Sequence, residues 1–590
     1  MSSDVTPPAP NPGVDTVGSP VAPKPRFAWP LLAAIAAGCA LAFAALTMFT
    51  GPTKTASGDE KAKGDEKKAE KKDEKEQPPE ERKRPDAPEL DGGTAWLNAG
   101  GPVSMKDLKG KIVLLDFWTL CCINCIHIQP DLKKLEKKYP NELVVIGVHS
   151  PKFENEKDTK SIRKAVLRYE IAHPVVNDAD HKIWSRYGID AWPTMVLVDP
   201  EGKYLGEISG EGNYEVLDKV IAKLIKDHKE KKTLNEKPLR FDTAQFRDAD
   251  TPLFFPGKVV ADEAGKRLFI ADSTHHRVVI TDLGGNKIAV AGSGTPGKAD
   301  GAFDKAQFDD PQGMALQGDT LFVADRKNHT LRALDLKTLT VTTVAGTGTQ
   351  EGDFTNRRLE KAVPATTIGL NSPWDLLLVG DLLYVAMAGH HQIWAYDTKA
   401  KTIVPYAGSG RENIGDGAFN AAMFAQPSGL ASDGKNLYVA DSEISALRQV
   451  PLGGAGRVET LVGRGLFKFG DIDGPGQIEN PLERETKEAR LQHALGVVHR
   501  DGKLYIADTY NSKIKVYDLA TKTLTTFLGG NDVGGWLTGP LFNEPAGLSQ
   551  AGGKLYVADT NAHRIRVVDL ATKKVTTLKL TGVEPPVAAK

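Results

Sequence analysis

The sequence has few cysteines, and their placement excludes a fold held together by disulfides. The chain of 590 residues contains only four, at Cys39, Cys121, Cys122 and Cys125. No cysteine lies beyond Cys125, so nothing could cross-link the larger part of the chain. Net charge is lacking as well, since 75 basic and 76 acidic side chains nearly cancel. Without an overall basic field, we expect no nucleic-acid partner.

Long apolar runs are also scarce, and the only one predicts a transmembrane helix at residues 27–49. No side chain from Phe27 to Phe49 is charged. A helix of that length spans about 34 Å, enough to cross a hydrocarbon core. A cleaved signal peptide is the alternative interpretation, although the run is longer than the usual apolar region of such peptides.

The segments beside this run lack a hydrophobic pattern, which predicts a disordered tail at 1–26 and a charged disordered linker at 50–92. Lys24 and Arg26 precede the apolar run, which favours a cytoplasmic N-terminus, whereas lysines after the run favour the reverse. We expect a single-pass membrane protein with an extracytoplasmic, periplasmic body.

Residues 93–235 alternate strand and helix patterns, which predicts an α/β domain. Strands are expected at 112–118, 143–148, 195–198 and up to about 208. Helices are expected at 130–139, 162–169 and 214–229.

Residues 237–580 contain six similar segments, which predicts a six-bladed β-propeller followed by a short tail at 581–590. The second strands of the segments are Leu268–Asp272, Leu321–Asp325, Leu383–Met387, Leu437–Asp441, Leu504–Asp508 and Leu555–Asp559. Two longer intervals carry insertions near 349–370 and 465–490. We expect these insertions to lie on one face of the ring and to shape a binding surface.

The stretch from Leu115 to Leu132 resembles the active-site region of thioredoxin-fold oxidoreductases. A strand ending in Asp-Phe-Trp precedes Cys-x-x-Cys, and Pro130 follows five residues after Cys125. At a helix start, free N–H groups and the helix dipole stabilise a thiolate. In this register Cys122 is the nucleophile and Cys125 the resolving thiol, which exchange through a mixed disulfide.

This resemblance implies roles for further residues. Asp116 corresponds to the buried carboxylate that accepts the proton of the resolving cysteine. Pro193, within Trp192-Pro193-Thr194, corresponds to the cis-proline that faces the disulfide. Trp118, Trp192 and Thr194 are expected to contact the substrate, which would be a protein thiol or disulfide.

Metal and cofactor sites are disfavoured by the residues around the cysteines. Haem attachment needs His after the second cysteine, where Ile126 stands, and a structural zinc site needs a second pair of ligands. We therefore expect no metal and no cofactor beyond a redox-active disulfide.

Several alternatives stay open for the cysteine cluster. Cys121 and Cys125 have the Cys-x-x-x-Cys spacing of copper carriers, but Trp192-Pro193 stands where those proteins need His. Thr119 and Cys122 fit a peroxidase motif, but Leu115 replaces its proline. The cluster could also be inert in a scaffold domain. Cys121 either pairs with Cys125 or fills a hydrophobic slot.

Four histidines occupy equivalent positions of the repeats, at His276, His329, His391 and His563. A ring of imidazoles suggests a metal, but Ser445 and Ser512 hold the same position in two blades, which indicates a repeated turn. The turn resembles the NHL repeat, in which this histidine belongs to the motif. The repeat aspartates are expected to cap turns. A cation in the channel of a propeller hydrolase or lyase is a third hypothesis.

Together, the Cys-Cys-Ile-Asn-Cys motif and the NHL ring resemble the NHL-repeat-containing protein 2 family over about 93–580. The chain departs from that family in its N-terminal anchor and in ending at Lys590, before a further C-terminal β domain. The resemblance implies that the propeller binds partner proteins. We expect a membrane-anchored thiol–disulfide oxidoreductase whose propeller recruits substrates, or alternatively a non-catalytic interaction scaffold.

Overall fold

The computed structural model describes residues 84–241, 251–352, 358–530 and 541–586. Residues from Arg84 onward form one compact unit. The predicted tail, the transmembrane segment and most of the linker lie outside the described residues, so those predictions are not tested. Among the described residues, none of the helices combines the length and apolarity needed to cross a membrane.

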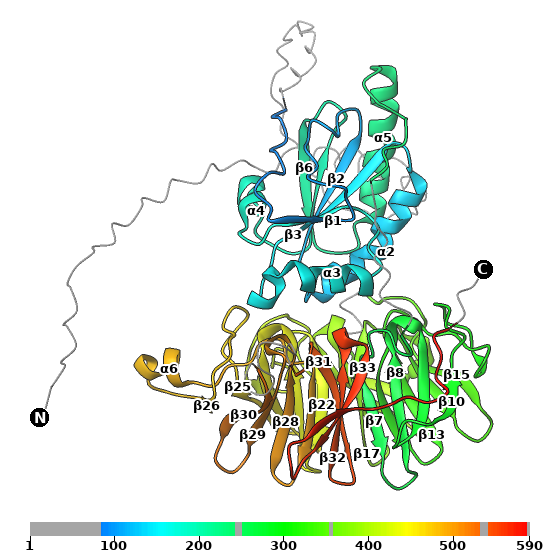
Figure 1. Cartoon of the computed structure of the whole chain (residues 1–590), viewed down its shortest axis with the longest axis vertical. Helices are drawn as coiled ribbons and strands as arrows, with labels where there is room; N and C mark the ends of the chain where they lie inside the picture. Colours follow the sequence, from blue (N-terminus) through cyan, green and yellow to red (C-terminus); the bar gives the residue numbers. More distant parts are fainter. Residues whose placement is uncertain (1–83, 242–250, 353–357, 531–540, 587–590) are drawn as a thin grey trace, which may run out of the picture. The chain divides into compact units, whose positions relative to one another are not determined.

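The N-terminal part of this unit is an α/β domain around one six-stranded sheet (Figure 1). The strand order is β1-β4-β3-β2-β5-β6, with β2 parallel to β3 and antiparallel to β5. The elements are β1 (Ala95–Leu97), β2 (Ile112–Trp118), α2 (Ile123–Lys138), β3 (Leu143–His149), α3 (Thr159–Arg168), β4 (Val175–Asn177), α4 (Lys182–Tyr187), β5 (Thr194–Val198), β6 (Tyr204–Ser209) and α5 (Tyr214–Glu230). The predicted α/β, thioredoxin-like fold is confirmed.

The sheet is covered on both faces, because every residue of the central strands β2 and β3 is buried, whichever face its side chain points to. Leu132 of α2 and Ile221 of α5 pack on one face, and Ile183 of α4 packs on the other. The sequence did not reveal β1, β4 or α4, which are too short to carry a hydrophobic period.

The domain begins before the predicted boundary at residue 93. Leu90 is 1% exposed and belongs to the core behind the sheet, and Asp86 forms a β-bridge with Lys203. The predicted linker therefore ends too late. Leu90 is a single apolar side chain after a long charged run, so it produced no periodic pattern in the sequence. Its burial nevertheless attaches the segment before residue 93 to the domain.

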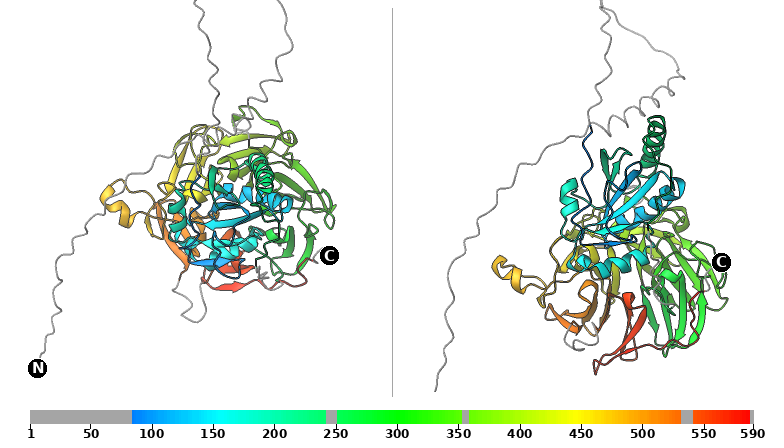
Figure 2. Two further views of the ribbon diagram at one scale, coloured as in Figure 1. Left: turned by 90° about the horizontal axis from the view of Figure 1, so that it is seen from above. Right: turned by 45° about the horizontal axis from the view of Figure 1, so that its top comes forward.

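The rest of the unit is a propeller of six β-sheets, as predicted. The sheets follow one another around a ring in chain order, coloured from green through yellow to red in Figure 2. Blade 1 comprises β7 (Val259–Asp262), β8 (Arg267–Asp272), β9 (Arg277–Asp282) and β10 (Lys287–Ala291); blade 2 comprises β11 (Gly301–Ala302), β12 (Pro311–Gln317), β13 (Thr320–Asp325), β14 (Thr330–Asp335) and β15 (Thr340–Ala345).

The other four blades repeat this arrangement. Blade 3 comprises β16 (Val363–Pro364), β17 (Pro373–Val379), β18 (Leu382–Met387), β19 (Gln392–Asp397) and β20 (Thr402–Ala407); blade 4 comprises β21 (Gly417–Ala418), β22 (Pro427–Ser432), β23 (Asn436–Asp441), β24 (Ala446–Pro451) and β25 (Arg457–Val462). Blade 5 comprises β26 (Gly474–Pro475), β27 (Gly496–Arg500), β28 (Lys503–Asp508), β29 (Lys513–Asp518) and β30 (Thr523–Gly529), with α6 (Pro481–Lys487) in its insertion; blade 6 comprises β31 (Pro545–Ala551), β32 (Lys554–Asp559), β33 (Arg564–Asp569) and β34 (Val575–Thr577).

The C-terminal segment up to residue 586 packs against blade 1, so residues 581–586 of the predicted tail belong to the propeller. Thr581 bridges to Asn286 at the outer edge of blade 1, and Val583 is 4% exposed. In blades 2 to 5 a two-residue strand occupies this outer position. The segment thus covers an edge that would otherwise be open.

Small residues let the inner strands of neighbouring blades approach closely. A Cβ added at Gly313 would lie 2.3 Å from the Cα of Asp375, and one at Gly496 would lie 2.0 Å from the carbonyl oxygen of Ala546. Blade 3 has Asp375 at this position instead of glycine. The Asp375 carboxylate accepts a hydrogen bond from the ammonium of Lys258, 3.1 Å away.

Candidate functional site

The three cysteines lie where β2 gives way to α2. Cys122 is the N-cap residue of α2, in extended conformation, and its side chain makes no capping hydrogen bond. Cys121, Cys122 and Cys125 are 2%, 9% and 0% exposed, and all are free thiols. The predicted disulfide is therefore not formed in this structure. Cys122 is the most exposed of the three cysteines.

Two electrostatic features surround these thiols. The start of α2 presents backbone N–H groups, which carry partial positive charge, beside Cys122. Burial raises the pKa of both Cys121 and Cys125 well above its ordinary value. Cys125 thus needs a nearby proton acceptor to become a nucleophile.

The carboxyl of Asp116 interacts with Cys125. Its side chain is fully buried on β2, as predicted, and one carboxylate oxygen accepts a hydrogen bond of 3.1 Å from the Gln129 amide of α2. Burial raises the pKa of Asp116 to about 7, against the opposing effects of His173 and Gln129. The charge of Asp116 also raises the pKa of Cys125, so the two groups interact.

The predicted cis peptide is present between Trp192 and Pro193. It precedes β5, which pairs with β2 so that Thr194 lies opposite Phe117, one residue before the end of β2. Trp192 packs against the apolar cluster that contains the cysteines. The sheet register therefore brings the proline loop to the cysteine loop.

Trp118 and Thr194 differ from the prediction that they contact substrate. Each is 1% exposed. Trp118 packs edge-on against His149, with ring centroids 4.9 Å apart, and the Thr194 hydroxyl donates to the carbonyl of Ala191. Both side chains point inward at this edge of the sheet, where the surrounding core covers them. They therefore pack beneath the cysteine and proline loops.

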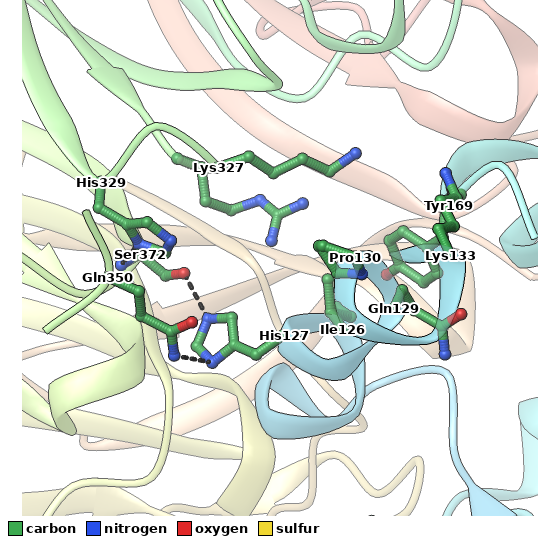
Figure 3. Close-up of a pocket in the computed structure, with 11 residues that line it drawn as sticks. Ile126, His127, Gln129, Pro130, Lys133, Tyr169, Lys327, His329, Gln350 and Ser372 are labelled. Atoms are coloured by element: carbon green, nitrogen blue, oxygen red, sulfur yellow. Dashed lines mark hydrogen bonds between the residues drawn. The ribbon is translucent and has the colours of Figure 1, made fainter. Parts of the chain in front are cut away.

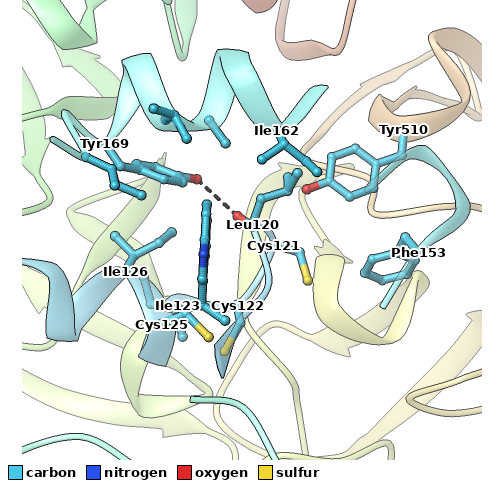
Figure 4. Packing of buried hydrophobic residues seen from close by; sticks show 14 of the residues in the cluster. Leu120, Cys121, Cys122, Ile123, Cys125, Ile126, Phe153, Ile162, Tyr169 and Tyr510 are labelled. Carbon is cyan, nitrogen blue, oxygen red and sulfur yellow. Dashed lines mark hydrogen bonds between the residues drawn. The ribbon is translucent and has the colours of Figure 1, made fainter. Parts of the chain in front are cut away.

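The propeller covers the cysteine loop. Cys121, Cys122 and Cys125 share one apolar cluster with propeller side chains (Figure 4). The propeller members of that cluster are Trp374, Ala388, Leu495, Tyr510 and Ala546. Cys121 fills a slot at this boundary, with its sulfur 3.7 Å from the Glu443 carboxylate. No sequence pattern indicated that the thioredoxin-like site would face the ring.

One residue per blade precedes the inner strand on the propeller face that meets the thioredoxin-like domain, and we call these six residues the docking ring. Its members each precede the inner strand and have φ between 48° and 64°: Phe255, Asp310, Ser372, Gln426, His493 and Glu544. Five of the six have a proline immediately after them, and His493 precedes Ala494. The recurring proline marks the position before it in five of the six repeats, and this was the sequence signal from which the docking ring could have been found.

Five members of the docking ring touch the thioredoxin-like domain through different chemistry. Phe255 lies under the guanidinium of Arg168, His493 packs against Phe153, and Glu544 pairs with Arg168 at 3.2 Å. Ser372 and Gln426 form hydrogen bonds with α2 and the cysteine loop. The ring is thus a mixed apolar and polar surface.

The repeated histidines hold the docking ring in place rather than a metal. The Nδ1 atoms of His276, His329, His391 and His563 accept the backbone N–H groups of Asp310, Ser372, Gln426 and Phe255, at 3.0 to 3.3 Å. Ser445 accepts from His493 in the same way. Each bond links one blade to the next, which confirms the structural interpretation of this position.

The repeat aspartates are structural in a similar way. In all five blades that have one, a carboxylate oxygen accepts a backbone N–H from the loop before the inner strand, at 2.6 to 2.9 Å. Their second oxygens meet basic side chains of the next strand, such as Arg332 opposite Asp325.

Both insertions lie on the face that meets the thioredoxin-like domain. Gln350 donates to Glu211, and Phe469 packs on Phe153 with ring centroids 4.6 Å apart. Beside Gln350, His127 of α2 is hydrogen-bonded to Ser372 at 2.7 Å (Figure 3). It also contacts Glu211 at 2.6 Å. A cavity of about 80 Å³ beside this chain has room for a few water molecules only.

The propeller channel contains an ammonium group of the chain itself. Lys258 Nζ donates to Asp375 and to the carbonyls of Ser428 and Leu495, so it connects blade 1 to blades 3, 4 and 5. This group lies where the third hypothesis placed a metal ion. Its three N–H bonds are all used.

One group among the described residues has the donor set for a metal ion, formed by Asp199, Glu201 and His228. The Arg84 guanidinium lies 3.7 Å from Asp199, and Thr233 is hydrogen-bonded to His228. These existing partners leave the group better explained as a polar cluster between the hairpin and the end of α5.

Comparisons with known proteins match the two-part architecture. A family model described as thioredoxin-like matches residues 110–204, and one for the NHL repeat matches 542–568. Thiol-disulfide oxidoreductase YkuV of Bacillus subtilis is 29% identical over 143 residues, which cover 24% of this chain and 95% of that protein.

Two relatives match both parts of the chain. Protein SUPPRESSOR OF QUENCHING 1, chloroplastic, of Arabidopsis thaliana is 44% identical over 524 residues, covering 85% of this chain and 48% of that protein. NHL repeat-containing protein 2 of Gallus gallus is 41% identical over 537 residues, covering 84% of this chain and 72% of the relative. At this identity and coverage, the chain belongs to the NHL repeat-containing protein 2 family.

Proposed function

We propose that this protein is a thiol–disulfide oxidoreductase that acts on protein thiols or disulfides, with Cys122 as nucleophile and Cys125 as resolving thiol. The observation that carries the proposal is the position of Cys122, at the N-cap of α2, next to the Trp192–Pro193 loop. The relationship to thiol-disulfide oxidoreductase YkuV supports the same chemistry.

The exchange proceeds in two balanced steps. The Cys122 thiolate attacks one sulfur of a substrate disulfide, forms a mixed disulfide and releases the other substrate sulfur as a thiolate. The Cys125 thiol transfers its proton to Asp116 and attacks Cys122, which releases the second substrate thiolate. The substrate gains two electrons, and the pair becomes a disulfide that a dithiol reductant must restore.

The N-terminal segment adds a proposed location. An apolar stretch from Phe27 to Phe49 would tether the domains to a membrane, with the body on the extracytoplasmic side. An oxidising compartment outside the cytoplasm is where protein disulfides persist and where thiol exchange is needed.

Single-cysteine variants of the full chain test the proposed chemistry. Cys122→Ser is expected to abolish the reduction of insulin by the protein in the presence of dithiothreitol, because the attacking sulfur is gone. Cys125→Ser should accumulate a mixed disulfide visible by mass spectrometry. Cys121→Ser is the matched control and should keep its activity. Equal turnover by Cys122→Ser and the wild type would refute the proposal.

A second candidate function is a non-catalytic scaffold, which the propeller cover on the thiols favours. In that case the thioredoxin-like domain serves only to complete the interface. Titration of the full chain with glutathione redox buffers separates the two functions. A pair that stays unmodified in every buffer supports the scaffold, and reversible oxidation of Cys122 and Cys125 rules it out.

A further inference from the structure

The contact between Gln426 and the cysteine loop is unlike the rest of the docking ring, because it engages the backbone on both sides of Cys122. Gln426 Oε1 accepts the N–H of Ile123 at 2.8 Å, and Gln426 Nε2 donates to the carbonyl of Cys121 at 3.0 Å. Because both partners are backbone groups, the orientation of the amide is unambiguous.

The Gln426 side chain is held rigidly in this position. It is 1% exposed, and its backbone N–H is bonded to His391 on the preceding blade. Its carbonyl accepts hydrogen bonds from Ser428 and Ser442. Blade 4 therefore presents a fixed amide to the loop.

The two backbone groups that Gln426 occupies form a pairing site for an extended chain. In a parallel β-ladder, one residue donates its N–H to the carbonyl of residue i−1 and accepts the N–H of residue i+1 on the neighbouring strand. Cys121 and Ile123 stand in that relation to Cys122. The Gln426 amide has the same donor and acceptor as such a residue.

We propose that Gln426 stands in for one residue of an extended substrate chain opposite Cys122, so that the propeller keeps the thiol covered until a disulfide-containing polypeptide segment displaces it. This inference rests on the proposed oxidoreductase function. It makes Gln426 a positioning residue of the redox site and makes extended polypeptides, rather than small disulfides, the substrate class.

The test compares alkylation of Cys122 by iodoacetamide in the full chain, followed by peptide mass spectrometry. Gln426→Ala removes both bonds, and we expect the rate at Cys122 to rise about tenfold or more. Asn155→Ala is the matched control, since it removes a different interdomain bond, to Glu544 at 3.1 Å. If Gln426 only helped the domains to dock, both variants would have equal effects, and the inference would be overturned.

A kinetic readout separates substrate competition from loosening of the fold. With insulin as the substrate, Gln426→Ala should lower KM by about tenfold with little change in kcat, since the chain no longer displaces an internal competitor. The small disulfide of Ellman's reagent should show no such KM change. An unchanged KM for insulin overturns the inference.

A second variant covers the possibility that Gln426→Ala fails to fold. Gln426→Glu keeps an acceptor for the Ile123 N–H but opposes the Cys121 carbonyl with a carboxylate, so it should also speed alkylation of Cys122. Thermal unfolding identifies the folded variants. Faster alkylation of Cys122 without any insulin turnover would refute the oxidoreductase function but support the covering role of Gln426. Insulin turnover with unchanged alkylation and KM would support the oxidoreductase function and refute the covering role of Gln426.

Discussion

At the scale of single residues, the proposed redox chemistry depends on which buried groups can ionise. Cys125 and Asp116 are both fully buried, so neither ionises easily on its own. Passing one proton between them keeps a single negative charge in the pocket, which costs less than charging both. The Asn variant of Asp116 isolates the electrostatic part of this arrangement.

Asp116→Asn should change how stability depends on pH. The folded-state pKa is about 7, above the roughly 3.9 of an unfolded aspartate, so the folded chain keeps a proton that the unfolded chain loses. Asp116 should therefore contribute a fall in stability of up to about 4 kcal/mol as the pH rises from about 4 to 7, beside the falls due to other buried carboxyls whose pKa is raised, such as those of Asp325 and Asp441. The variant should lack the Asp116 part, so its curve should fall less steeply than that of the wild type. Urea unfolding at pH 4.5, 6 and 8 measures it.

The exposed Asp190 provides the control for this prediction. Asp190→Asn should retain the wild-type pH dependence, because this side chain is exposed to solvent in the folded chain as it is in the unfolded chain. Parallel curves for the wild type and Asp116→Asn would contradict the assigned burial of the Asp116 charge.

At the scale of elements, the ring depends on the fit between inner strands. Neighbouring blades approach so closely at β27 and β31 that the Gly496 position leaves no room for a methyl group. The histidine-to-backbone bonds link four other pairs of neighbouring blades, at the start of their inner strands. Together these features fix the docking ring as one surface rather than six loops.

Gly496→Ala should therefore destabilise the propeller by about 1–3 kcal/mol, because its Cβ would meet the Ala546 carbonyl oxygen at 2.0 Å. Gly352→Ala is the control, since nothing lies within 4 Å of the added atom. Guanidinium unfolding of both full-chain variants checks the difference. Equal free energies of unfolding for the two variants would show that neighbouring blades can move apart without loss of stability.

At the scale of the whole described unit, the thioredoxin-like domain is fastened to the propeller by buried charges as well as by apolar packing. Lys152 Nζ lies 2.6 Å from Glu443 Oε1, and their side chains are 3% and 6% exposed. Burial raises the pKa of Glu443 and opposes the attraction of Lys152. Removing one partner thus leaves a buried charge without compensation.

Lys152→Met should lower the free energy of unfolding by about 3–5 kcal/mol, and the double variant Lys152→Met/Glu443→Gln should recover much of that loss. Lys157→Met breaks an exposed ion pair with Glu154, whose side chains are 47% and 69% exposed, and should cost about 1 kcal/mol or less. Chemical denaturation of the full chain measures all three. A similar loss for both single variants would mean that the interdomain pair is effectively solvated.

The sequence by itself determined the two folds and pointed to the residues that we propose to react. Both folds are written in local patterns, namely the strand-helix alternation and the six repeats of Leu-Tyr-Val-Ala-Asp type. The Cys-x-x-Cys motif, Asp116 and Trp192-Pro193 are likewise short motifs, and sheet register brings them together in the thioredoxin fold.

Only the tertiary structure decided what the cysteine loop faces. Gln426 lies about three hundred residues after Cys122, and only its place before Pro427 marks it in the sequence. Its contact arises because left-handed residues of six blades converge on one face, and because that face complements the cysteine loop in shape and hydrogen bonding. Such complementarity belongs to two surfaces at once, so no local sequence pattern could express it.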